Sequence, residues 1–394
     1  MKVITKYLLV MLFALAWNVQ ASDQSTGYQE HHTNHLELMG KILNSTVLIQ
    51  IHKEGKVVAS GSGVIISEDG NILTNYHVVH KADQIRIWTH ENKNRQYHVA
   101  KVLGTDPVAD LALLDIDPVG KEVFHNAGLD FRPGVVYPGI DVWAVGAPLQ
   151  LPWTVTKGII NQVNRLSFIT PYVHLIQHDA VIQEGSSGGP LFNADGNVIG
   201  INTYVIAPTS GKIEKSRQYS GMGYAVQLNS IAYSLAQMHD TGEVVRPALK
   251  LNIINLTEPL RDWILESEDP APHIPNTFGM IMNFIEPGGH AAKQGMQNWD
   301  VVVAIDGQPV NDMTDVAEIM IQKRPGEIVN VLIIRRGEFI NIQYLLDAID
   351  IPLSYYDDKK KATDPYPTPP PDEDVHPEEE EKENPKPSIV PEDE

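Results

Sequence analysis

Short apolar runs separated by turn residues fill residues 43–230, and they limit this part of the chain to a β-rich fold. The runs are rich in Val, Ile and Thr, as in residues 46–51, 63–66 and 198–202. Asp69-Gly70 and Asp195-Gly196 stand beside two of them, where a hairpin turn needs residues that accept positive φ. Many short strands at this spacing predict an all-β sandwich or barrel.

A smaller unit of mixed helices and strands is expected after this region. Residues 229–238 carry apolar side chains on one helical face, and Thr241-Gly242 is a helix-stop signal, so we place a domain boundary there. A second helix is predicted from about Asp312 to Gln322, with Val316, Ile319 and Met320 on one stripe. Residues 246–347 therefore predict one small α+β domain.

The amino terminus has the pattern of an export signal. Lys2 and Lys6 precede an apolar run over residues 7–17, and the small-residue site Val19-Gln20-Ala21 follows. We predict a signal peptide over residues 1–21, which implies an exported, periplasmic protein with no stable membrane span after cleavage. A retained membrane anchor is the alternative, although the apolar run is short for one. Residues 22–40 are then an N-terminal segment ahead of a first domain at 41–243.

The net charge of -20 is concentrated at the other end of the chain. Residues 362–394 hold 12 acidic and 2 basic side chains, a net charge of -10, among many prolines. Such a segment cannot bury apolar surface, so residues 358–394 are predicted to be a disordered acidic tail. The charge also argues against nucleic acid as a partner. The chain has no cysteine, which excludes disulfides, thiolate nucleophiles and zinc-thiolate sites.

Three residues predict nucleophilic catalysis. Ser187 lies among glycines in Gly185-Ser186-Ser187-Gly188-Gly189-Pro190, ahead of an apolar strand. Alone this could be a flexible loop. His77 ends an apolar strand as a candidate base, and Asp110 precedes another strand as its orienting carboxylate. The backbone N–H groups of Gly185 and Ser187 are the candidate donors for the oxyanion.

The blocks around these residues, in this chain order, resemble the HtrA/Deg family of chymotrypsin-like serine proteases. The likeness covers residues 60–66, 74–79, 106–114, 156–160, 183–190 and 221–226. It implies a mainly β fold with a chymotrypsin-like double β-barrel protease domain at 41–243, followed by one PDZ domain at 246–347. It further implies an ATP-independent endopeptidase without cofactors, forming a homotrimer, that cleaves unfolded or misfolded polypeptides with small aliphatic P1 residues. The loop at 204–221 would contribute to the S1 pocket.

Other residues near these motifs are weaker candidates for the same roles. Ser186 stands one residue before the matched nucleophile and replaces the family's usual asparagine, while His80 and Asp115 fall outside the matched positions. His31-His32-x-x-His35 lies in a polar segment without further ligands, so no metal site is predicted.

The region 246–347 resembles the PDZ domain that follows HtrA protease domains, on residues 288–296 and 300–310. The resemblance implies binding of peptide C-termini by strand addition, and it assigns the carboxylate loop to Ala248, Leu249, Lys250 and Leu251. Lys250 replaces a glycine common there, which makes positive φ harder to reach and leaves a structural role as an alternative. For the whole chain, the alternatives are a proteolytically silent chaperone or peptide-binding protein of the same fold, and an interaction protein acting through its acidic tail.

Overall fold

The computed structural model describes residues 34–91, 96–118, 123–132, 134–148, 151–166, 172–205, 222–267, 273–274 and 279–349. The signal-peptide prediction, the acidic tail, most of the S1 loop, and His31 and His32 lie outside these residues. Within them, no helix combines the length and the apolar character needed to cross a membrane.

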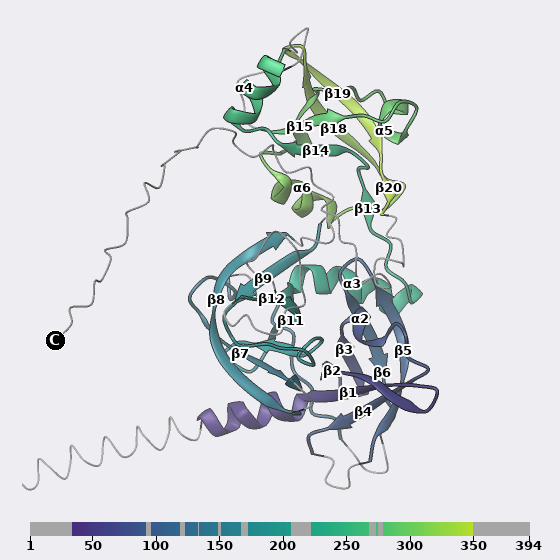
Figure 1. Cartoon of the computed structure of the whole chain (residues 1–394), viewed down its shortest axis with the longest axis vertical. Coiled ribbons are helices and arrows are strands. Elements are labelled where there is room, and N and C mark those ends of the chain that lie inside the picture. The colour runs from purple at the N-terminus through teal and green to yellow at the C-terminus, as the bar shows by residue number, and fades with distance from the viewer. Residues whose placement is uncertain are drawn as a thin grey trace, which may run out of the picture.

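The first two units of the structure are closed six-stranded barrels, which confirms the mainly β, double-barrel prediction (Figure 1). The first barrel has the strand order β1-β2-β3-β6-β5-β4. Its elements are β1 (Thr46–Lys53), β2 (Lys56–Ile65), β3 (Asn71–Thr74), a short helix α2 (Tyr76–Val79), β4 (Gln84–Thr89), β5 (His98–Asp106) and β6 (Leu111–Asp115). Gly70 between β2 and β3 has a φ of 99°, the positive value that the predicted hairpin turn requires.

The second barrel has the order β10-β11-β12-β9-β8-β7 and is closed by antiparallel pairs throughout. Its elements are β7 (Asp141–Gly146), β8 (Thr154–Leu166), β9 (His174–His178), β10 (Pro190–Phe192), β11 (Val198–Val205) and β12 (Gly223–Gln227). Residues 34–45 form a helix that leads directly into β1. Lys41 of this helix donates to the Asp195 carbonyl, so the helix is fastened to the β10–β11 turn.

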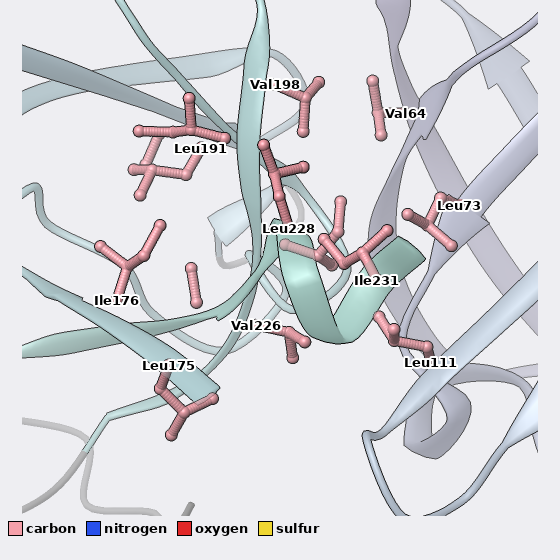
Figure 2. Close-up of a cluster of buried hydrophobic side chains, with 14 of the residues drawn as sticks. Val64, Leu73, Leu111, Leu175, Ile176, Leu191, Val198, Val226, Leu228 and Ile231 are labelled. Atoms are coloured by element: carbon pink, nitrogen blue, oxygen red, sulfur yellow. The ribbon is translucent and has the colours of Figure 1, made fainter. Parts of the chain in front are cut away.

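The helix α3 (Leu228–Thr241) packs where the two barrels meet. Figure 2 shows Leu228 and Ile231 between Val64, Leu73 and Leu111 of the first barrel and Leu175, Ile176 and Leu191 of the second. All of these side chains are at least nine-tenths buried. The helix ends as predicted at Gly242, whose φ of 79° is the left-handed conformation of a C-cap glycine.

The third unit is a six-stranded antiparallel sheet with three helices, above the barrels in Figure 1. Its main strand order is β14-β15-β16-β18-β19, with β17 paired to β16 and a separate pair β13-β20. The strands are β13 (Pro247–Ala248), β14 (Asn252–Asn255), β15 (Met280–Phe284), β16 (Val301–Ile305), β17 (Gln308–Pro309), β18 (Ile328–Arg335), β19 (Glu338–Leu345) and β20 (Asp347–Ala348). The helices are α4 (Glu258–Ser267), α5 (His290–Lys293) and α6 (Met313–Met320).

The predicted apolar stripe of α6 is buried, and Asp312 caps its first turn by accepting from the N–H groups of Thr314 and Asp315. The third unit also contacts the barrels. Tyr172 of the second barrel joins the buried cluster of the third unit, and the Tyr233 hydroxyl of α3 donates to the Lys323 carbonyl just after α6.

Candidate active site

His77 and Asp110 lie against each other at the end of the first barrel. His77 is in α2, directly after β3, and Asp110 directly precedes β6, which pairs with β3. The Asp110 Oδ2 and the His77 Nδ1 are 2.7 Å apart, and the Asp110 Oδ1 accepts from the His77 backbone N–H at 2.9 Å. A carboxylate can only accept, so Nδ1 carries the proton and Nε2 is left as the basic nitrogen.

The backbone of Asp110 also holds the start of α2. Its carbonyl accepts from the Asn75 side-chain amide at 2.8 Å and from the Tyr76 N–H at 3.1 Å. Asp110 has a φ of 56°, a left-handed conformation that Asp tolerates better than most residues. The aspartate therefore fixes both the imidazole and the short helix that carries it.

Ser187 lies in a loop of the second barrel that abuts the end of β3. A Cβ on Gly188 would come within 2.2 Å of the Thr74 Oγ1 and 3.0 Å of the Asn75 N, two residues before His77. Gly188 has a φ of 82° and Gly185 a φ of 97°, so both glycines are required by the course of the chain. The loop thus brings Ser187 to the edge that presents His77.

Thr203 of β11 links Ser187 to Asp110. The Thr203 Oγ1 donates to the Asp110 Oδ2 at 2.7 Å, while the Ser187 Oγ donates to the Thr203 carbonyl at 3.2 Å. Among the described residues, no hydrogen bond joins the Ser187 Oγ to the His77 Nε2. The serine hydroxyl is thus held beside the histidine–aspartate pair, with its proton directed to a carbonyl.

The backbone N–H groups of Gly185 and Ser187 have no hydrogen-bond partner in the part of the chain that the structure describes. The intervening Ser186 N–H donates to the Gln183 carbonyl at 2.8 Å. Unpartnered donors beside a serine hydroxyl can stabilise a developing oxyanion. The sequence prediction named these same two groups.

The competing residues are placed elsewhere. Ser186 is 5% exposed, and its Oγ accepts from the Gln183 N–H at 3.3 Å, within its own turn. His80 follows α2 and stacks on Tyr76. Asp115 pairs with Asn71 at the end of β6 opposite to Asp110. Among the described residues, no cluster of three or more His, Asp or Glu side chains is arranged to hold a metal ion.

A buried ion pair supports the turn that carries Asp110. The Asp106 Oδ1 accepts from the Ala109 N–H at 3.0 Å, and its Oδ2 accepts from the Arg246 Nη2 at 2.7 Å and from the Ser234 Oγ at 2.6 Å. The Arg246 and Asp106 side chains are 1% and 0% exposed. Arg246 directly precedes β13, so the ion pair joins the start of the third unit to the turn that carries Asp110.

Comparison with known proteins gives a consistent result. Residues 61–201 match the model of the trypsin-like peptidase domain, and residues 285–335 match that of the PDZ domain. A protein of Halomonas elongata named "probable periplasmic serine endoprotease DegP-like" is 33% identical over 283 residues, covering 72% of this chain and 55% of the relative. A protein of the same name from Marinomonas sp. is 31% identical, covering 75% of this chain and 58% of the relative.

Solved structures agree with these relatives. The HtrA-type protease AlgW with a tripeptide superposes with a TM-score of 0.67 at 28% identity, covering 80% of this chain and 97% of that one. The serine endoprotease from Yersinia pestis superposes with a TM-score of 0.58 at 26% identity, covering 79% of this chain and 97% of that one. The chain belongs to the HtrA/Deg family. It spans little more than half the length of the curated relatives it matches.

The loop that the family resemblance assigns to peptide carboxylates is well packed in this HtrA/Deg chain. Ala248 in β13 pairs with Asp347, and the carbonyl of the buried Leu249 accepts a hydrogen bond from the Tyr344 hydroxyl. Lys250 has the positive φ of 47° that its glycine-like position demands, and its ammonium group pairs with Asp347 at 2.7 Å. The ion pair lowers the pKa of Asp347. Leu251 is half-buried against the same cluster.

Sequence reasoning missed Thr203 and the supporting role of Asp106 and Arg246. Thr203 follows no motif, because a threonine in a β-strand is ordinary. Asp106 and Arg246 stand 140 positions apart, and only the packing of α3 brings them together.

Proposed function

We propose that this chain is an ATP-independent serine endopeptidase of the HtrA/Deg type. The observation that carries the proposal is that the Asp110 carboxylate binds both His77 and Thr203. The carbonyl of Thr203 in turn accepts from the Ser187 hydroxyl. In this arrangement Ser187 is the nucleophile, His77 the general base and then acid, and Asp110 the residue that orients the imidazole.

The mechanism follows from the donors and acceptors present. Turning the Ser187 hydroxyl from the Thr203 carbonyl to the His77 Nε2 exchanges one neutral hydrogen bond for another, at a cost on the order of 1 kcal/mol or less. Nε2 then takes the hydroxyl proton as Oγ attacks the scissile carbonyl. Asp110 stabilises the imidazolium, and the N–H groups of Gly185 and Ser187 receive the oxyanion. The proton passes to the leaving amine, and water hydrolyses the acyl-enzyme by the reverse roles.

The substrate class and setting are also proposals. The relatives are named as probable periplasmic serine endoproteases, and residues 1–21 have the pattern of a signal peptide. We therefore infer cleavage of unfolded or misfolded exported polypeptides, a homotrimeric assembly, and a PDZ domain that binds peptide C-termini or regulates activity. The domain limits 41–243 and 246–347 are part of this proposal.

One observation favours a second candidate, a proteolytically silent chaperone or peptide-binding protein. The Ser187 Oγ donates to the Thr203 carbonyl, which is also the arrangement of a hydroxyl that is not being activated.

Hydrolysis of casein, with and without C-terminal peptides, separates the two candidates. Wild-type protein should cleave casein and react covalently with a fluorophosphonate, and Ser187→Ala should abolish both. Absence of cleavage and labelling by the wild type under every activating peptide and temperature would favour the silent chaperone.

A further inference from the structure

Ser62 belongs to the first barrel, yet its hydroxyl and its backbone N–H both bond to the nucleophile loop of the second. The residue lies in β2 and is 0% exposed. Its Oγ donates to the Gly185 carbonyl at 2.7 Å and accepts from the Ala147 N–H at 2.9 Å. Its backbone N–H donates to the Ser187 carbonyl at 2.9 Å. Ser62 therefore holds the carbonyls of both residues whose N–H groups are the oxyanion donors.

The geometry of the loop shows why these contacts matter. The carbonyl of Ser186 is held within the loop by the Gly189 N–H at 3.0 Å. The two carbonyls on either side of it, those of Gly185 and Ser187, both depend on Ser62. Gly185 is a glycine with a φ of 97°, so nothing in its own chemistry prevents the peptide after it from rotating.

A rotation there would misalign the donors. The Gly185–Ser186 peptide lies between the two N–H groups, and its own N–H is already bonded to Gln183. If the Gly185 carbonyl lost its donor, this peptide would be held only through the Ser186 N–H, and the two adjoining peptides, which carry the Gly185 and Ser187 N–H groups, could shift with it. Oxyanion stabilisation requires donors fixed before the reaction, because a donor that must reorient contributes much less.

Ser62 also fixes the loop relative to the base. Its carbonyl accepts from the Thr74 Oγ1 at 2.7 Å, and Thr74 is three residues before His77 in the same barrel. The Thr203–Asp110 hydrogen bond is another polar contact between the barrels, whereas the apolar cluster around Leu228 gives attraction without a fixed direction. The polar contacts of Ser62 therefore set how the Ser187 loop is placed against the barrel of His77 and Asp110.

We propose that Ser62 is a positioning residue that holds the oxyanion-binding conformation of the Gly185–Ser187 loop. It acts through the loop backbone and does not touch the substrate. The assignment rests on the proposed serine-protease function and adds a residue of the first barrel to the oxyanion-binding apparatus of the second.

The test compares Ser62→Ala with Ser45→Ala in the full chain. Ser45 is the matched control, because it is also 0% exposed and its hydroxyl donates to the Lys41 and Ile42 carbonyls, away from the site. Hydrolysis of a chromogenic peptide measures the effect. In Ser62→Ala the kcat should fall about 10- to 100-fold, with KM within about twofold of wild type. The loss should be smaller than the about 100- to 1000-fold cost of removing an oxyanion donor, because here a donor is only misaligned. Ser45→Ala should keep the wild-type kcat.

A second measurement distinguishes positioning from general loosening. Affinity for a peptide boronate, which mimics the tetrahedral intermediate, should fall in Ser62→Ala by about the same factor as kcat, while affinity for a non-cleaved product peptide stays unchanged. If Ser62→Ala does not fold, Ser62→Cys keeps the side-chain volume with a weak donor, and its kcat should lie below that of wild type.

The outcomes separate the two hypotheses. An active wild type with Ser62→Ala or Ser62→Cys matching Ser45→Ala in kcat and boronate affinity overturns the positioning role alone. A wild type that neither hydrolyses peptides nor reacts with fluorophosphonate overturns the proposed function, and the role of Ser62 with it.

Discussion

Two buried histidines of the second barrel should make the fold sensitive to mild acid. His174 and His178 are both 0% exposed. Burial lowers the pKa of each from 6.5 to about 4, with the positive charge of Arg246 as a further cause at His174. Each folded-state pKa lies below the unfolded value, so the unfolded chain binds more protons between pH 6.5 and 4. Stability is therefore complete above pH 6.5 and falls as the pH drops through this window.

The magnitude follows from the two pKa values. At pH 5 a shift from 6.5 to about 4 removes about 2 kcal/mol of stability for each histidine, or about 4 kcal/mol for the pair. This is a large part of the roughly 5–15 kcal/mol that stabilises a typical protein. The ion-paired carboxylate of Asp130, with its pKa lowered to about 2, stays ionised over the same range and does not contribute.

Urea unfolding at pH 7.5 and pH 5 measures this effect. In His178→Gln the amide can still donate to the Asn202 Oδ1, which His178 contacts at 3.1 Å, and in His174→Asn the amide oxygen can still accept from the Asn229 amide. Neither replacement titrates. Each variant should lose about 2 kcal/mol less than wild type between the two pH values, whatever its stability at pH 7.5. A pH dependence equal to that of wild type in both variants would refute the reasoning.

Three further outcomes can be measured on the same protein. Arg246→Met should lower the free energy of unfolding by about 3–5 kcal/mol in urea, because it leaves the buried Asp106 carboxylate without its charged partner; an unchanged midpoint would mean that the pair is not buried in solution. Thr203→Val should lower kcat at least about tenfold with Thr203→Ser near wild type, because only the hydroxyl binds Asp110, and equal activity of both variants would contradict this. Asp312→Ala should cost about 1 kcal/mol by removing the cap of α6, and a stability loss within error in thermal unfolding would argue against the cap.

The parts of the fold that sequence predicted are those set by local patterns. The end of α3 at Gly242 and the apolar stripe of α6 follow from periodicity and from the conformational freedom of glycine. The barrels followed from short strands at regular spacing together with the family resemblance. Helix 34–45 crosses the limit placed between residues 40 and 41, and it is attached through Lys41 and through Ile42, which is buried in the core of the barrels.

The placement of the candidate site could be predicted only in part. His77, Asp110 and Ser187 stand in recognisable motifs, and the glycines at 185 and 188 have the positive φ that the loop needs. Ser62 is in a motif too, but the sequence gives no sign that its hydroxyl reaches a loop 123 positions away. Such contacts arise from tertiary packing, and an ordinary serine or threonine in a strand carries no signal of its partner.

The buried polar contacts also explain how an interface between two barrels can hold a reaction geometry. The apolar cluster around Leu228 supplies attraction, but it would tolerate small shifts of one barrel against the other, because hydrophobic contact has no preferred direction. Catalysis does not tolerate them, since a displacement of about 1 Å can cost about 100-fold in rate. Two side-chain hydrogen bonds join the barrels at the site, from the Ser62 hydroxyl to the Gly185 carbonyl and from the Thr203 hydroxyl to the Asp110 carboxylate. A shift would leave these groups without partners, so the two contacts make the aligned arrangement the one of lowest energy.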